Sequence, residues 1–153
     1  ECDIYDESKL PVDCWEAYDV YIVGGGLYAG RINGVPLLHR HWEDLVNKCV
    51  VLFTVGLSDP GDMAQLAPLL QKSLTDEMRQ KIKTFHFRGS IDYANLNFKH
   101  RTMMKMLRAM LTKKSEEQRS AEDQALLDTF GQYTDFSDEN AILPLVDYVK
   151  GFE

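Results

Sequence analysis

Apolar residues fall into short runs that are separated by longer stretches with helical spacing. The run Val20–Val23 is rich in β-formers and leads directly into three glycines. The run Cys49–Leu57 is continuously apolar, which is typical of a strand buried on both faces of a parallel sheet. A third strand is predicted over Lys83–Ile91, and a weak one over Cys2–Tyr5.

Helical spacing of apolar residues predicts the remaining elements. The first helix is expected to begin near Pro36, because Asn33, Gly34 and Pro36 prevent a helix from starting at the glycines themselves. Further helices are predicted over residues 62–83 with an interruption at Pro68, and over residues 98–112, 121–130 and 141–150.

Residues that favour helix ends support these boundaries. Thr75 and Ser120 are predicted N-caps, since a hydroxyl oxygen can accept from a free backbone N–H group. Gly131 is expected to end the helix before it. Pro144 is tolerated only in a first turn, so the last helix is not expected to begin much before Asn140.

The order of these elements predicts the fold class. Strands that alternate with helices indicate an α/β fold built on a doubly wound parallel sheet, with helices on both faces. A chain of 153 residues is expected to form a single domain, residues 1–153.

Charge and cysteine content exclude some classes of function. The net charge of −7 argues against nucleic acid and anionic membrane as the main partners, although it leaves room for a local basic patch. Cys2, Cys14 and Cys49 are odd in number and form no C-x-x-C pair. We therefore expect no disulfide framework and no metal site, and a cytoplasmic protein. No apolar run reaches membrane-spanning length.

The glycines after the first strong strand are the main candidate for chemistry. The carboxyl ends of parallel strands open onto a crevice, and glycine lets backbone N–H groups approach a ligand closely. Gly24-x-Gly26-x-x-Ala29 formally matches a dinucleotide-binding pattern. The helix begins too late for that pattern, however, and the next strand ends too far along the chain to supply the required acidic residue. A phosphate loop of the G-K-[ST] type is also excluded.

Several stretches resemble a known family. Tyr18–Arg31 resembles the third strand and following loop of flavodoxin-like domains, in which this loop lies along the isoalloxazine ring of FMN. Val51–Leu57 resembles the fourth strand of that family, and Phe85–Tyr93 the fifth. The Met-rich segment that follows is similar to the extra segment of bacterial flavodoxin-domain proteins related to menaquinone-dependent protoporphyrinogen oxidase.

The resemblance implies an FMN-binding electron-transfer protein or oxidoreductase. Its partner would be a redox protein or a small-molecule acceptor such as a quinone. No side-chain acid or base is required, since the flavin carries the chemistry. Tyr28 would stack on the ring, or pack over the strand end, and Asp59 would contact the ring edge or serve as a turn residue. The residues that the resemblance assigns to the cofactor are Gly24, Gly25, Gly26, Leu27, Tyr28, Ala29, Gly30, Gly56, Leu57, Ser58 and Asp59.

The chain departs from the family at the phosphate of FMN. Flavodoxins hold this group in a turn like T-x-T-G-x-T after their first strand, and no stretch of these residues matches it. By the resemblance, Cys2–Tyr5 is the family's second strand, and the central first strand that precedes it is absent. We expect these residues to be part of a longer protein, because deletion of a central strand would expose two edges. In a truncated form, FMN binding would be doubtful.

Two further functions stay open. The helical segment 98–112 would suit a quinone-linked enzyme of the protoporphyrinogen-oxidase type, and the missing phosphate turn would suit a non-catalytic interaction module that has lost FMN. On this segment His100, Arg101, Lys105 and Arg108 form a basic face, either solvated or used for docking to a quinone, a porphyrin carboxylate, an acidic partner or a membrane. His86 is expected to be a core histidine or one with its hydrogen bonds satisfied.

Overall fold

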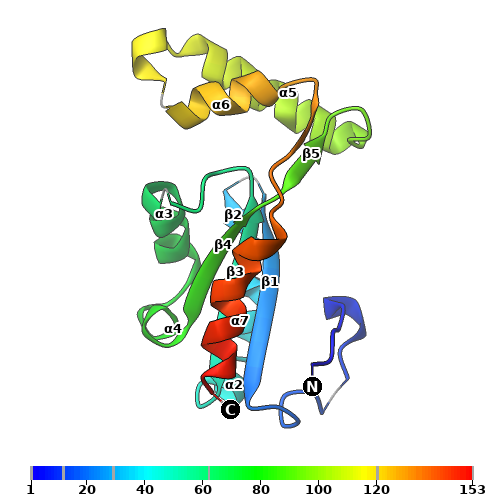
Figure 1. Ribbon diagram of the computed structural model, residues 1–153, viewed down its shortest axis with the longest axis vertical. Coiled ribbons are helices and arrows are strands. Elements are labelled where there is room, and N and C mark those ends of the chain that lie inside the picture. Colours follow the sequence, from blue (N-terminus) through cyan, green and yellow to red (C-terminus); the bar gives the residue numbers. More distant parts are fainter. Residues whose placement is uncertain (1, 12, 29, 62, 120, 153) are drawn as a thin grey trace. The chain divides into compact units, whose positions relative to one another are not determined.

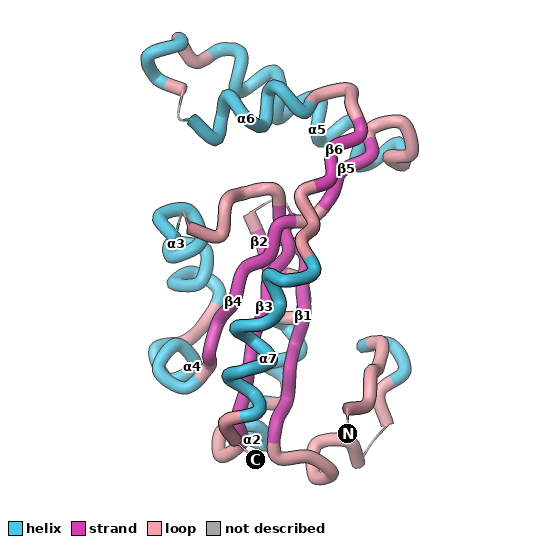
Figure 2. The backbone as a smooth tube through the Cα atoms, in the orientation of Figure 1, coloured by secondary structure: helices cyan, strands magenta, loops and turns pink. Residues whose placement is uncertain are grey.

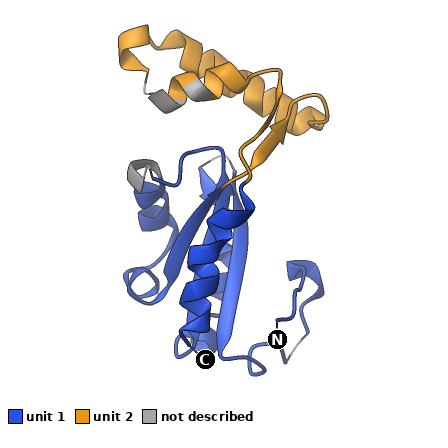
Figure 3. Ribbon diagram, viewed as in Figure 1, with its two compact units in different colours: residues 1–87, 138–153 blue, residues 88–137 orange. Residues whose placement is uncertain are grey.

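The computed structural model describes residues 2–11, 13–28, 30–61, 63–119 and 121–152. The chain divides into two compact units (Figure 3). The first comprises residues 1–87 and 138–153, and the second residues 88–137. Each is described separately below.

A four-stranded sheet forms the centre of the first unit, in the order β2-β1-β3-β4 (Figure 1). β1 (Val20–Tyr28) pairs with β3 (Cys49–Gly56) in parallel, and with the short β2 (Arg31–Ile32) in an antiparallel hairpin. β4 (Lys83–Arg88) lies next to β3. The sheet is thus mostly parallel, and the predicted α/β class is confirmed.

One face of this sheet is covered by four helices, whose bounds are α1 (Val35–Arg40), α2 (Trp42–Leu45), α3 (Met63–Ser73) and α4 (Asp76–Lys81). Their apolar side chains form one cluster with those of β1 and β3 that point to the same side. Leu38, Leu45 and Leu52 in this cluster are fully buried. Burial of each such side chain stabilises the fold by roughly 1.5–3 kcal/mol.

The other face of the sheet carries α7 (Leu143–Lys150), which follows the 3₁₀ turn η3 (Glu139–Ile142) (Figure 2). The ring of Tyr148 meets that of Phe85 of β4, with centroids 6.1 Å apart. Leu145 is buried. Pro144 lies in the first turn of α7, as predicted, where its missing N–H has no helical partner to lose.

The glycines of β1 lie inside the strand, so the prediction that they follow it is wrong. Gly24, Gly25 and Gly26 pair in register with β3. A Cβ at Gly24 would lie 2.2 Å from the ring of Phe53, and one at Gly25 would lie 1.6 Å from the backbone oxygen of Asn33. Glycine is therefore required here because other parts of the same chain come close to the strand on both faces.

The predicted strand Cys2–Tyr5 is also wrong. These residues have no strand pairing among the described residues, and Ile4 is 92% exposed. The segment instead contacts the ring of Tyr18, whose hydroxyl donates to a carboxylate oxygen of Asp3 and shares a 3.1 Å hydrogen bond with the hydroxyl of Tyr5. The segment leads into the 3₁₀ turn η1 (Glu7–Lys9). A strand-like sequence forms a strand only where a neighbour supplies hydrogen bonds.

One predicted helix and one predicted strand differ from the structure, and one predicted helix cap is confirmed. Pro68 lies inside α3 without ending it, because Leu66 and Leu70 on either side are buried in the core and hold both halves of the helix in place. The predicted strand Lys83–Ile91 is divided at Gly89. Thr75 caps α4 as predicted, since its hydroxyl accepts from the N–H of Met78 at 3.2 Å.

The second unit combines a two-stranded sheet with two helices, and its elements are β5 (Ser90–Asp92), α5 (Phe98–Lys113), η2 (Glu116–Gln118), α6 (Ala121–Thr129) and β6 (Tyr133–Asp135). β5 and β6 pair antiparallel. Asn97 caps α5 by accepting from the N–H of His100 at 2.9 Å. Both helices confirm the predicted segments, and Gly131 follows α6 with φ of 85°. The proposed cap Ser120 lies outside the described residues.

The glycines of β1 provide a matched pair for a stability test. Gly25→Ala should lower the free energy of unfolding by about 3 kcal/mol, because the new Cβ collides with a backbone oxygen that cannot rotate away. Gly26→Ala should change it by less than about 1 kcal/mol, since the nearest atom to its Cβ is 4.0 Å away. Urea denaturation of both variants measures the difference. Equal effects would contradict the packing account.

Candidate functional site

The parallel pairing of β1 and β3 brings both predicted loop segments to one edge of the sheet. Gly26 is paired with Val55, so β1 and β3 end side by side, at Tyr28 and Gly56. The carboxyl edge of a parallel sheet is where α/β proteins bind ligands. Both segments that the sequence assigns to the cofactor therefore share the expected edge.

Three residues from different strands meet at this edge. A Cβ on Gly56 would lie 3.0 Å from Cδ1 of Leu27 and 3.2 Å from Cε1 of His86. Leu27 belongs to β1, Gly56 to β3 and His86 to β4. The absent side chain at Gly56 thus lets Leu27 and His86 pack closely over this half-buried residue. We call Leu27, Gly56 and His86 the edge cluster.

The other glycines predicted to contact the cofactor lie either within the sheet or in the turn after β1. Gly24 and Gly25 lie within the sheet, where Phe53 and the backbone of Asn33 fill the space beside them, so the structure does not bring them to the edge. Gly30 lies in the turn between β1 and β2 and has a φ of 71°. Ala29 lies outside the described residues, and so does the side chain of Tyr28.

The segment after β3 turns sharply at Asp59. A carboxylate oxygen of Asp59 accepts from the N–H of Gly61 at 2.8 Å, which is the geometry of an Asx turn. The structure therefore gives Asp59 the turn role, one of its two predicted roles. Leu57 and Ser58 are half-buried between this turn and Gly56.

His86 is the functional candidate that the sequence did not single out. Its Nδ1 shares a 2.7 Å hydrogen bond with the hydroxyl of Thr54. Its Nε2 is buried, and no described atom meets the geometry of a hydrogen bond to it. The expectation of a core or satisfied histidine therefore holds at Nδ1, whereas Nε2 is buried without such a bond. The only signal in the sequence is its position in β4, which needs the register of the sheet to interpret.

Burial also changes the titration of this ring. Loss of solvent lowers the pKa of His86, and smaller effects of the Ser58 and Thr54 backbones and of Asp59 oppose that change. The neutral imidazole is therefore the favoured form.

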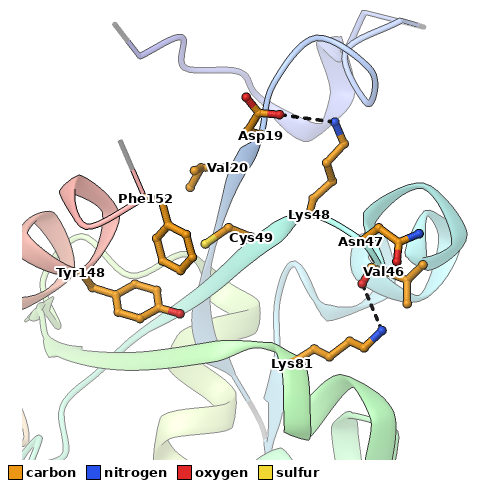
Figure 4. Close-up of a pocket in the computed structure, with 9 residues that line it drawn as sticks. All are labelled: Asp19, Val20, Val46, Asn47, Lys48, Cys49, Lys81, Tyr148 and Phe152. Carbon is orange, nitrogen blue, oxygen red and sulfur yellow. Dashed lines mark hydrogen bonds and ion pairs between the residues drawn. The ribbon is translucent and has the colours of Figure 1, made fainter.

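A hollow of about 470 Å³ lies at the opposite edge of the sheet (Figure 4). It is lined by the amino ends of β1 and β3 and by the end of α7, with two lysines among its residues. Lys48 donates to the backbone oxygen of Tyr18 at 2.9 Å, and Lys81 to that of Val46 at 3.2 Å. Burial raises the pKa of the Cys49 thiol, so this cysteine is not an activated nucleophile.

Comparison with protein families identifies the domain. The family model described as a flavodoxin domain matches residues 1–118. The chain belongs to the flavodoxin domain family. The match covers β1, β3, β4 and α5, and it confirms the resemblance stated from the sequence. No curated protein and no solved structure matches the chain significantly.

The residues of this flavodoxin domain suit the ring of FMN but not its phosphate. The edge cluster places a leucine and an imidazole beside the half-buried Gly56, and apolar and polar groups of this kind line sites for planar heterocycles. No stretch of the chain matches the family's phosphate turn. No group of acidic, histidine or cysteine side chains suited to a metal ion occurs in the described part of the chain. Likewise, no described helix could cross a membrane.

The lowered pKa of His86 predicts a pH-dependent stability. Below about pH 6.5, the unfolded chain binds a proton at this residue more readily than the folded chain does. The contribution of His86 to stability is therefore complete above this pH and is lost as the pH falls through it. His86→Asn, whose amide can still donate to Thr54, removes the titration.

Urea denaturation of both proteins between about pH 7.5 and about pH 5 tests this prediction. The stability of the wild type relative to the variant should fall as the pH is lowered. A constant difference across this range would contradict the assignment.

Proposed function

We propose that this flavodoxin domain binds the isoalloxazine ring of FMN at the carboxyl edge of β1 and β3 and takes part in electron transfer. The observation that carries the proposal is the edge cluster, in which three strands of a family member bring Leu27 and His86 together beside the half-buried Gly56. A bound flavin would supply the redox chemistry. The chain would bind and orient the ring and set its electrostatic surroundings.

The chain's own residues have distinct parts in this proposal. Backbone groups from Gly56 to Ser58 would bond the polar edge of the ring, and Leu27 would pack against its apolar part. The neutral imidazole of His86 would pack beside the ring. The part of the chain outside residues 88–137 has nine Lys and Arg against seventeen Asp and Glu. This negative charge would disfavour an anionic reduced flavin and lower its potential.

A second candidate function is an interaction module without flavin. The observation that favours it is the open edge of β1, since residues Val20–Gly25 have no partner strand on that side within the described residues. Ile22 on this strand is 40% exposed. An open edge can accept a strand from elsewhere.

Titration with two flavins tests the proposed function. FMN and riboflavin share the ring, and only FMN carries the phosphate. The 153-residue chain should bind both with affinities within about threefold, because its residues contact the ring and include no phosphate turn. Quenching of flavin fluorescence measures both affinities. A failure to bind either flavin would overturn the proposal and favour the interaction module.

A substitution within the edge cluster locates the ring. Gly56→Ala should weaken binding of both flavins roughly tenfold, since its Cβ would displace Leu27 and His86 from their positions at the edge. The fold should tolerate it, because the nearest atom is the end of the flexible Leu27 side chain. Gly151→Ala, after α7, is the control and should bind like the wild type. Unchanged binding by Gly56→Ala would place the flavin elsewhere.

A further inference from the structure

Helix α5 in the second unit has large apolar side chains on its exposed side as well as on its buried side. Phe98 is 86% exposed, Met106 64% and Met110 65%. The inward side of the same helix already buries Met104 and Leu111. At 100° per residue, the three exposed side chains fall within an arc of roughly 120°. They therefore form one stripe on the exposed side of the helix, outside the core.

Lysines are interleaved with this stripe. Lys99 and Lys113 fall within the same arc, and Lys105 lies beside it. All three are exposed, and within the described residues no carboxylate pairs with them. We call Phe98, Lys99, Lys105, Met106, Met110 and Lys113 the α5 outer face.

The arginines of the basic face predicted from the sequence also contact other parts of the second unit. Arg101 donates to the backbone oxygens of Ala94 and Leu96, at 3.2 and 3.1 Å. The guanidinium of Arg108 lies 5.7 Å from the ring centre of Phe130. Both arginines stay exposed and charged beside the α5 outer face, whose own charges are all lysines.

The charge of α5 is opposite to that of the rest of the chain. The helix contains five Lys and Arg and no Asp or Glu, although the chain as a whole has a net charge of −7. An anionic partner attracts this positive helix and repels the acidic remainder of the protein. The helix would therefore face the partner.

We propose that the α5 outer face docks on the surface of an anionic lipid bilayer. Phenylalanine and methionine can enter the boundary between headgroups and acyl chains, while lysines extend their ammonium groups to the lipid phosphates. A fluid surface imposes no fixed pattern of partners, which suits flexible methionines and lysines. Protein interfaces are instead enriched in arginine and depleted in lysine. The proposal does not depend on flavin binding.

Co-sedimentation of the whole chain with vesicles tests the proposal. The protein should bind vesicles of phosphatidylcholine mixed with phosphatidylglycerol and not vesicles of phosphatidylcholine alone. Salt should weaken the binding, because it screens the lysines. An absence of binding to the anionic vesicles at low salt would overturn the proposal.

Two triple variants with the same net charge separate the α5 outer face from overall charge. Lys99→Glu/Lys105→Glu/Lys113→Glu should weaken vesicle binding by about 100-fold or more. Lys9→Glu/Lys72→Glu/Lys150→Glu changes three exposed lysines of the first unit and should weaken it by less than about tenfold. Equal losses would overturn the proposal.

A third variant tests insertion into lipid. Phe98→Ser/Met106→Ser/Met110→Ser keeps all charges and changes only exposed side chains, so circular dichroism should match that of the wild type. Vesicle binding should weaken by at least about tenfold, because the apolar groups no longer enter the bilayer. Unchanged binding would show a purely electrostatic contact, overturn the lipid proposal and point to an acidic macromolecule instead.

Discussion

The parallel pairing of β1 with β3 is the interaction on which the rest of the first unit depends. The register runs from Val20 opposite Cys49 to Gly26 opposite Val55. Because the strands are parallel and in step, their carboxyl ends lie together. The same register decides which side chains face α1–α4 and which face α7. The edge cluster is a direct consequence of this pairing, since β4 adds His86 beside the end of β3.

The glycines of β1 have a different physical role from the one that their pattern suggests. Gly24 and Gly25 allow close contact by Phe53 and by the backbone of Asn33, and so they stabilise the sheet. Gly34, with φ of 88°, lets the chain turn into α1 directly after that contact. The proposed ligand region therefore starts at Gly26. A glycine-rich sequence indicates close approach, but it does not say whether a ligand or the chain itself approaches.

Patterns among neighbouring residues correctly predicted the helices and strands that depend on interactions between neighbours in the sequence. The strand starting at Val20, the strand of residues 49–56 and the helix α5 follow from hydrophobic spacing, and the cap at Thr75 follows from its hydroxyl. The errors involve contacts between distant residues. Cys2–Tyr5 has no neighbour strand, and Pro68 stays helical because Leu66 and Leu70 are buried. The unpartnered Nε2 of His86 depends on the sheet register, which periodicity does not reveal.

The position of the flavin ring is the central claim, and amide chemical shifts measured during FMN titration test it most directly. We expect the largest changes at Leu27, Gly56, Leu57 and Ser58, at the carboxyl edge of the sheet. The competing position is the hollow at the opposite edge, where Lys48 and Lys81 could attract the phosphate. Changes centred on Lys48, Cys49 and Lys81, with none at Gly56, would contradict the account.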